Sequence, residues 1–142
     1  MPSIERHYIK QYIREFIFGG RAEFTILNTI NDIKYQYHVK ANEAGNIWFV
    51  SVKIDGGYRY AGFIKKNNEN EYEYIKGKKG MLSADSVPIK GLLWVIRHAD
   101  NMHPAIKVIH HGRCAKCGKE LTDEESIERG FGPICYKRVV RD

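Results

Sequence analysis

The stretch Ile33-Lys34-Tyr35-Gln36-Tyr37-His38-Val39-Lys40 alternates apolar and polar side chains almost without exception. This period of two is that of a β-strand with one buried face. Further strands are predicted on either side of it, at 22–28, 48–54 and 58–65. The connections between them are short, and Asp55-Gly56-Gly57 is typical of a tight hairpin. Because such short links join antiparallel neighbours, the pattern predicts an antiparallel β-meander.

Helices are predicted at two places outside the meander. Apolar side chains recur at helical spacing from 4 to 17, between Ser3 as a cap and Gly19-Gly20 as a terminator. A second helix is predicted to begin at Ser86, and its apolar face is expected to cover one face of the sheet. Two weaker strands complete the pattern, at 71–75 and 106–110.

The composition is that of an ordinary folded domain. Of the 142 residues, 43% are hydrophobic and 28% are charged, which argues against a disordered chain. The longest apolar run, 92–96, is far shorter than the roughly 20 residues that a membrane helix needs. Residues 1–6 mix charges and lack the apolar stretch of a signal peptide. We therefore expect a cytoplasmic protein with no membrane partner.

The charge balance favours an anionic partner. Lys and Arg number 23 against 17 Asp and Glu, which gives a formal net charge of +6. This balance is typical of proteins that bind nucleic acid or an acidic protein surface. The sequence shows no Ser/His/Asp order, glycine-rich phosphate loop or motif-borne carboxylate pair, so it offers no convincing active site.

Three cysteines carry the clearest chemical signal. They are an odd number and too few for a disulfide scaffold. Cys114 and Cys117 form a Cys-x-x-Cys pair followed by Gly118, which is the form of a zinc knuckle. Pro133 predicts the start of a short helix with Cys135 in its first turn. The alternative, a redox pair, lacks the βαβ pattern that usually surrounds one.

Tetrahedral zinc needs a fourth ligand, which the sequence offers as His110 or His111. His110 is preferred because it shares a face with Val108 on the strand that enters the knuckle, and His111 stays an alternative. We therefore predict one structural Zn²⁺ per chain. Since a closed four-ligand site has no open position for water, the protein is not expected to be an enzyme.

The cysteine region is predicted to form a module of its own. Residues 110–142 contain few large apolar side chains, so a metal is expected to hold them together. Thr122 and Glu125 have the spacing of a capping box for a short helix that ends at Gly130. The predicted fold is α+β, with a β-rich domain at 1–109 (an N-terminal helix and a small antiparallel meander covered by a helix). A treble-clef-like zinc knuckle at 110–142 is expected to pack on this domain or be tethered to it.

The pattern from His110 to Cys135, H-x-G-R-C-x-x-C-G-K-x-L-T-x-x-x-S-I-x-x-G-F-G-P-x-C, resembles a family of small proteins of unknown function that is common in phages and prophages. The segment 16–65 resembles the family more loosely. The resemblance implies zinc ligands at His110, Cys114, Cys117 and Cys135, and it supplies no activity. The phage association favours two roles, handling nucleic acid or blocking a host protein.

Two functions are therefore weighed. The first is a nucleic-acid-binding accessory protein that contacts phosphates through basic residues around the knuckle. These are Arg113, Lys116, Lys119, Lys137, Arg138 and Arg141. The alternative is a protein-interaction module or inhibitor that binds a host protein, for example one involved in defence, or a phage protein.

The tyrosines on the predicted strands have two interpretations, as core or as a binding surface. Tyr35 with Tyr37, and Tyr58 with Tyr60, recur at the strand period, so each pair shares a face. We favour these faces as core. If exposed, they would form a stacking platform for single-stranded nucleic acid beside nearby cations. Those cations are Lys34, Lys53, Arg59 and Lys65.

Overall fold

The alternating stretch lies in the middle of an antiparallel sheet. A computed structural model describes residues 7–78 and 82–139. Its strands run in the order β5-β4-β3-β2-β1-β6, and every neighbouring pair is antiparallel. The strands are β1 (Arg21–Asn28), β2 (Ile33–Ala41), β3 (Ile47–Ile54), β4 (Gly57–Lys66), β5 (Tyr72–Lys76) and β6 (Ile106–His110). The helices are α1 (Ile13–Ile17), α2 (Val87–Arg97), α3 (Glu124–Arg129) and α4 (Pro133–Val139).

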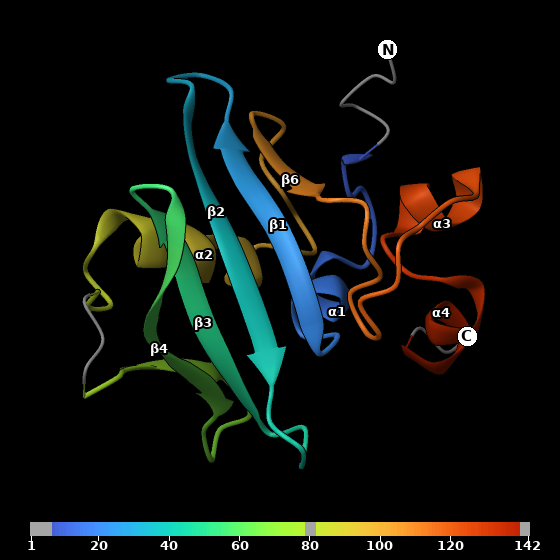
Figure 1. Cartoon of the computed structure of the whole chain (residues 1–142). Coiled ribbons are helices and arrows are strands. Elements are labelled where there is room, and N and C mark those ends of the chain that lie inside the picture. Colours follow the sequence, from blue (N-terminus) through green and yellow to red (C-terminus); the bar gives the residue numbers. More distant parts are fainter. Residues whose placement is uncertain (1–6, 79–81, 140–142) are drawn as a thin grey trace.

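The α+β class and the antiparallel meander are confirmed. Strands β1 to β5 follow one another across the sheet, and α2 begins after Ser86, as the sequence predicts. The last strand, β6, returns to the outer edge of β1, where Ile109 pairs with Thr25. This return brings the cysteine-containing segment beside the first strand, and α3 and α4 lie beyond β1 in Figure 1.

The prediction of a helix from 4 to 17 is wrong in its length. The helix α1 has five residues, and Tyr12 before it has a left-handed backbone with φ of 57°. Tyr8 instead pairs with Ile109, and the Ile9 N–H donates to the Val108 carbonyl at 2.8 Å. Pairing with the free edge of β6 gives this backbone hydrogen-bond partners without a helix. Ser3 lies outside the described residues.

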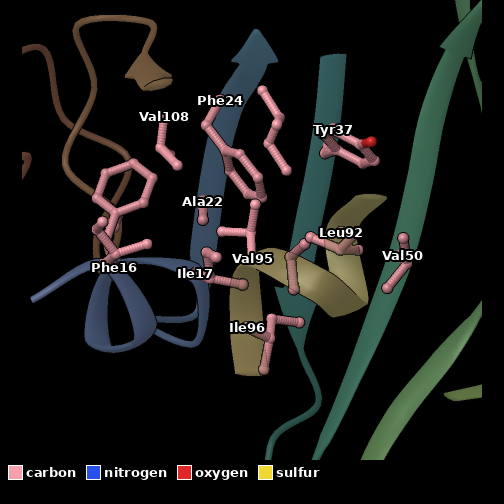
Figure 2. Packing of buried hydrophobic residues seen from close by; sticks show 14 of the residues in the cluster. Phe16, Ile17, Ala22, Phe24, Tyr37, Val50, Leu92, Val95, Ile96 and Val108 are labelled. Atoms are coloured by element: carbon pink, nitrogen blue, oxygen red, sulfur yellow. The ribbon is translucent and has the colours of Figure 1, made fainter. Parts of the chain in front are cut away.

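One face of the sheet and α2 enclose the core. Phe24, Tyr37 and Val50 point from the sheet towards Leu92 and other side chains of α2 (Figure 2). The Tyr37 hydroxyl donates to the Pro88 carbonyl at 2.7 Å, so the ring is anchored to the start of the helix. Burial of each large apolar side chain stabilises the fold by about 1.5–3 kcal/mol, so this layer dominates the packing energy.

The opposite face of the sheet is turned towards the viewer in Figure 1, with α2 behind it. In the part of the chain that the structure describes, no helix lies over this outer face. Tyr58 and Tyr60 lie on it and are 39% and 40% exposed, whereas Tyr37 is buried on the inner face. The prediction that the tyrosine pairs belong to the core therefore holds for Tyr35 with Tyr37 and not for Tyr58 with Tyr60.

Helix lengths bear on membrane insertion. The longest helix of the described residues, α2, has 11 residues. Across 7–78 and 82–139, no helix is long and apolar enough to span a bilayer.

Candidate metal centre

A tight turn after β6 brings the first two cysteines together. The Cys114 N–H donates to the Lys119 carbonyl at 2.8 Å, and the Gly118 N–H donates to the Cys114 carbonyl at 2.9 Å. Gly118 has φ of +78°, a conformation that costs other residues energy. The turn is closed further out where Arg113 pairs with Glu120. The glycine after Cys117 thus has the role that the sequence predicts.

The third cysteine comes from α4. This helix begins at Pro133, and the Tyr136 N–H donates to the Gly132 carbonyl at 2.8 Å. Cys135 therefore lies in the first turn, which confirms the sequence prediction. The sulfur atoms of Cys114, Cys117 and Cys135 all lie within 4.8 Å of one another. The three cysteines are free thiols, with no disulfide between them.

The three thiols form a donor set that suits a soft divalent cation such as zinc. Burial raises the pKa of the Cys114 thiol, but hydrogen bonds from the backbone N–H groups of Cys117, Gly132 and Lys116 outweigh it, and the net shift is downward. Burial and the two neighbouring thiols raise the pKa of Cys135 to about 11. The cluster can thus hold one thiolate readily, while further thiolates repel one another, and a cation would offset that repulsion.

The cluster rests on the same core as the sheet. Phe131 is fully buried, and its ring lies 5.9 Å from that of Phe16 in an edge-to-face arrangement. The Ala115 N–H donates to the Gly130 carbonyl at 3.0 Å, and the Ala115 carbonyl accepts from the Arg21 N–H at 2.6 Å. The module is therefore packed against α1 and β1. Its division from the rest of the chain at residue 109 stays a prediction.

His110 lies beside the cluster and is fully buried. Its Nδ1 accepts from the Gly112 N–H at 2.9 Å, and its Nε2 donates to the Ile127 carbonyl. The ring stacks on His7 with centroids 4.6 Å apart. Burial lowers the pKa of His110 to about 4, despite the hydrogen bond to Ile127, so the ring is neutral near pH 7. With both nitrogens engaged, His110 connects β6 to α3.

Among the described residues, the three-thiol group contains no histidine. The other candidate, His111, turns towards the outer face of the sheet. Its Nε2 lies 2.8 Å from Thr25 Oγ1, and its Nδ1 lies 3.8 Å from a carboxylate oxygen of Glu23. The fourth ligand at His110 therefore stays a prediction.

The short helix α3 between Cys117 and Cys135 begins one residue later than predicted. Asp123 is its N-cap, and the carboxylate accepts from the Ser126 N–H at 3.1 Å. The capping box of Thr122 with Glu125 is therefore wrong, because the stronger cap three residues before Ser126 takes this position. The hydrogen bond with Ser126 lowers the pKa of Asp123. The helix ends at Gly130 with φ of 79°, as expected.

The basic residues proposed for nucleic acid gather on two parts of the module. Arg113, Lys116 and Lys119 are exposed on the knuckle turn, and the Arg113 Nη1 donates to the Gly118 carbonyl at 3.1 Å. Lys137 and Arg138 are exposed in the last turn of α4. Arg141 lies outside the described residues.

Arg21 belongs to this surface, although the sequence analysis missed it. Its Nη1 lies 3.5 Å from the Cys117 carbonyl, and its Cδ approaches Gly118. The available signal was the pair Gly19-Gly20 before it. A Cβ at Gly19 would lie 3.0 Å from the Ala115 carbonyl oxygen, so glycine permits the knuckle to approach the chain closely.

Comparison with known proteins identifies the same segment. Residues 109–140 match the model of a family of unknown function, DUF6011. The matched segment contains the end of β6, the knuckle, α3, α4 and all three clustered cysteines. No curated protein and no solved structure matches the chain. The phage association stays a prediction. Over the segment that contains its three clustered cysteines, the chain is thus similar to a family whose function is not known.

Proposed function

We propose that this protein is a non-enzymatic, zinc-stabilised nucleic-acid-binding protein. In this proposal one Zn²⁺ per chain holds the C-terminal module in shape, and exposed cations of the module contact phosphates. The three clustered thiols support the metal. The basic side chains around these thiols support nucleic acid as the partner.

The metal has a structural role in this proposal. Cys114 is buried, and Cys117 and Cys135 are only partly exposed, so the cluster lies under the surface of the module. A cation there joins the knuckle to α4, a short helix that has no fully buried side chain. The rigid joint fixes the relative positions of the cations on both segments.

The observation that carries the proposal is the separation of charge within the module. The knuckle and the last turn of α4 expose basic side chains, namely Arg113, Lys116, Lys119, Lys137 and Arg138. Most of the acidic side chains lie on α3 or at its cap, namely Asp123, Glu124, Glu125 and Glu128. A cluster of one sign attracts the phosphate backbone more strongly than the same charges interspersed.

A paired charge reversal tests this proposal. The variant Lys137→Glu with Arg138→Glu removes two possible phosphate contacts at exposed positions, so the fold and the zinc content should persist. The salt dependence of duplex binding, plotted as log K against log salt, should flatten by about 1.8 units. The control Lys90→Glu with Arg97→Glu makes the same charge change at exposed positions of α2 and should leave the slope unchanged. A wild-type protein that retains no nucleic acid at low salt would contradict the proposal.

A second candidate function rests on a different part of the molecule. An apolar cleft of about 450 Å³ lies between α2 and the neighbouring ends of β1 and β2, with Trp94 and Tyr35 in its lining. Its rim includes Ile30, Ile33 and Val87, which are 78%, 47% and 62% exposed. Such a cleft favours a protein partner. Binding there should change little with salt, which separates it from phosphate binding.

A further inference from the structure

The outer face of the sheet, over which no helix of the described residues lies, carries a continuous row of side chains that begins at the knuckle. The strand register places Arg21 opposite Lys40, Lys40 opposite Phe49, and Phe49 opposite Phe63. In antiparallel strands such partners lie on the same face with side chains about 5 Å apart. Because the Arg21 Nη1 also approaches the Cys117 carbonyl, this row links the metal module to the centre of the sheet.

Exposed aromatic rings occupy the centre of this face. Phe49, Tyr58 and Tyr60 each leave close to 40% of their surface in solvent. The rings of Phe49 and Tyr60 lie with centroids 6.3 Å apart, and the ring of His38 lies 5.9 Å from that of Tyr58. Phe49 and Tyr60 are therefore neighbours, and Tyr58 lies on the same face two residues before Tyr60. Exposed aromatic surface of this kind is unusual on a sheet face that no helix of the described residues covers.

A β-bulge between β3 and β4 keeps the ring of Tyr60 exposed on the outer face. The register of β3 with β4 shifts between Val50 and Ser51, so Val50 pairs with Gly62 and Ser51 pairs with Tyr60. The shift leaves an extra residue, Ala61, and keeps Tyr60 on the outer face beside Phe49. Bulges are common where a sheet directs side chains for binding.

The charges beside these rings are mainly positive. The register gives Phe49 and Tyr58 a cationic neighbour each, because Lys40 is opposite Phe49 and Lys53 is opposite Tyr58, whereas Tyr60 is opposite Ser51. The cations on this face include Arg21, Lys34, Lys40, Lys53 and Lys65, and its acidic residues include Glu23 and Glu73. Aromatic rings between lysines are complementary to a chain of bases joined by phosphates.

We propose that this outer face binds single-stranded nucleic acid, with unpaired bases stacked on Phe49, Tyr58 and Tyr60. In this arrangement Lys40 and Lys53 contact the phosphates beside the stacked bases. A base can lie flat on a ring only when it is unpaired, so the surface selects single strands over duplexes. The inference rests on the proposed function and adds the substrate class and a second part of the binding surface. The row through Arg21 lets one strand pass from the rings to the cations of the knuckle.

Ring truncation is the direct test. Binding of a single-stranded RNA, a single-stranded DNA of the same sequence and the DNA duplex is measured for wild type, Phe49→Ala and Tyr60→Ala. Each variant should lose about 5- to 150-fold in affinity for a single strand and much less for the duplex. The control Lys90→Ala shortens an exposed side chain on α2, on the other side of the sheet, and should bind as wild type does. The strand that shows the larger loss identifies the sugar that the face prefers.

The outcomes separate this inference from the proposed function. If wild type binds no nucleic acid, both are contradicted. If it binds but Phe49→Ala and Tyr60→Ala bind single strands as wild type does, only the stacking surface is wrong. An equal loss on single strand and duplex also overturns selection for unpaired bases. Should the ring variants unfold, Lys40→Glu with Lys53→Glu gives a second test, since the salt slope for single strands should then flatten by about 1.4 units.

Discussion

Substitution of Gly130 by alanine tests whether the C-terminal module and the sheet share one tightly packed core. Gly130 ends α3 with φ of +79°, a conformation that costs an alanine about 1–2 kcal/mol. A Cβ added there would lie 2.6 Å from Cδ2 of Phe16. Phe16 is fully buried, and its ring is in edge-to-face contact with Phe24 and Phe131, so it has no open space to move into.

The backbone strain and the steric clash in Gly130→Ala add because they have different origins. The backbone term acts at Gly130 itself, whereas the steric term displaces the Phe16 ring from a packed core and costs about 1–3 kcal/mol. The free energy of unfolding should therefore fall by about 2–5 kcal/mol in Gly130→Ala. This is a large part of the 5–15 kcal/mol that is usual for a folded domain.

Urea unfolding measures this loss, and the same motif supplies a matched control. An alanine Cβ at Gly132 would have no neighbouring atom within 4 Å, and the φ of Gly132 is not positive. Gly132→Ala should therefore stay within about 0.5 kcal/mol of wild type. If Gly130→Ala is less than about 1 kcal/mol below Gly132→Ala, the core does not extend from α1 under the module as described.

Three further predictions concern the metal, a histidine and a buried tyrosine. Wild type purified without added metal should contain close to one zinc per chain by elemental analysis, and Cys117→Ser should lose it. Since burial lowers the pKa of His110 to about 4, from about 6.5 when unfolded, the wild type should lose stability as the pH falls below about 6.5. The loss between pH 7.5 and 5.5 should be about 1.3 kcal/mol by urea unfolding, and His110→Gln should lack this contribution. Tyr37→Phe should lower the free energy of unfolding by about 1 kcal/mol, measured by thermal melting, because the Pro88 carbonyl loses its donor.

Local sequence patterns predicted the strands and helices whose apolar side chains recur with a single clear period. The alternation at 33–40 became β2, and Ser86 became the N-cap of α2. The prediction of the N-terminal helix was wrong in length because its apolar spacing suits both a helix and an extended segment. Ile9 and Ile13 are both buried, although Ile9 lies outside a helix and Ile13 begins α1, and the free edge of β6 decided in favour of pairing at Tyr8. That edge is distant in sequence, so the segment itself carried no sign of it.

The candidate site was likewise predictable where the local sequence decides the structure, and not where the structure depends on distant segments. The spacing of Cys114 and Cys117 fixes a turn by itself, and Pro133 places Cys135 in a helix. The environment of His110 depends instead on the position of α3, whose Ile127 carbonyl accepts a hydrogen bond from the ring. Which tyrosine pair is buried depends likewise on the face where α2 packs. Periodicity shows which side chains share a face, but tertiary contacts decide which face is covered.

The pairing of the last strand with the first has a consequence during synthesis. Strand β1 ends at Asn28, and its partner β6 begins at Ile106, so the ribosome adds roughly 80 residues between them, which takes about 4–16 seconds. Through this interval β1 is an edge strand with unpaired backbone groups, a state prone to pairing with other chains. Only when the segment leading into the knuckle emerges can the nascent chain cover that edge with its own backbone. Chains truncated before Ile106 should therefore aggregate on release.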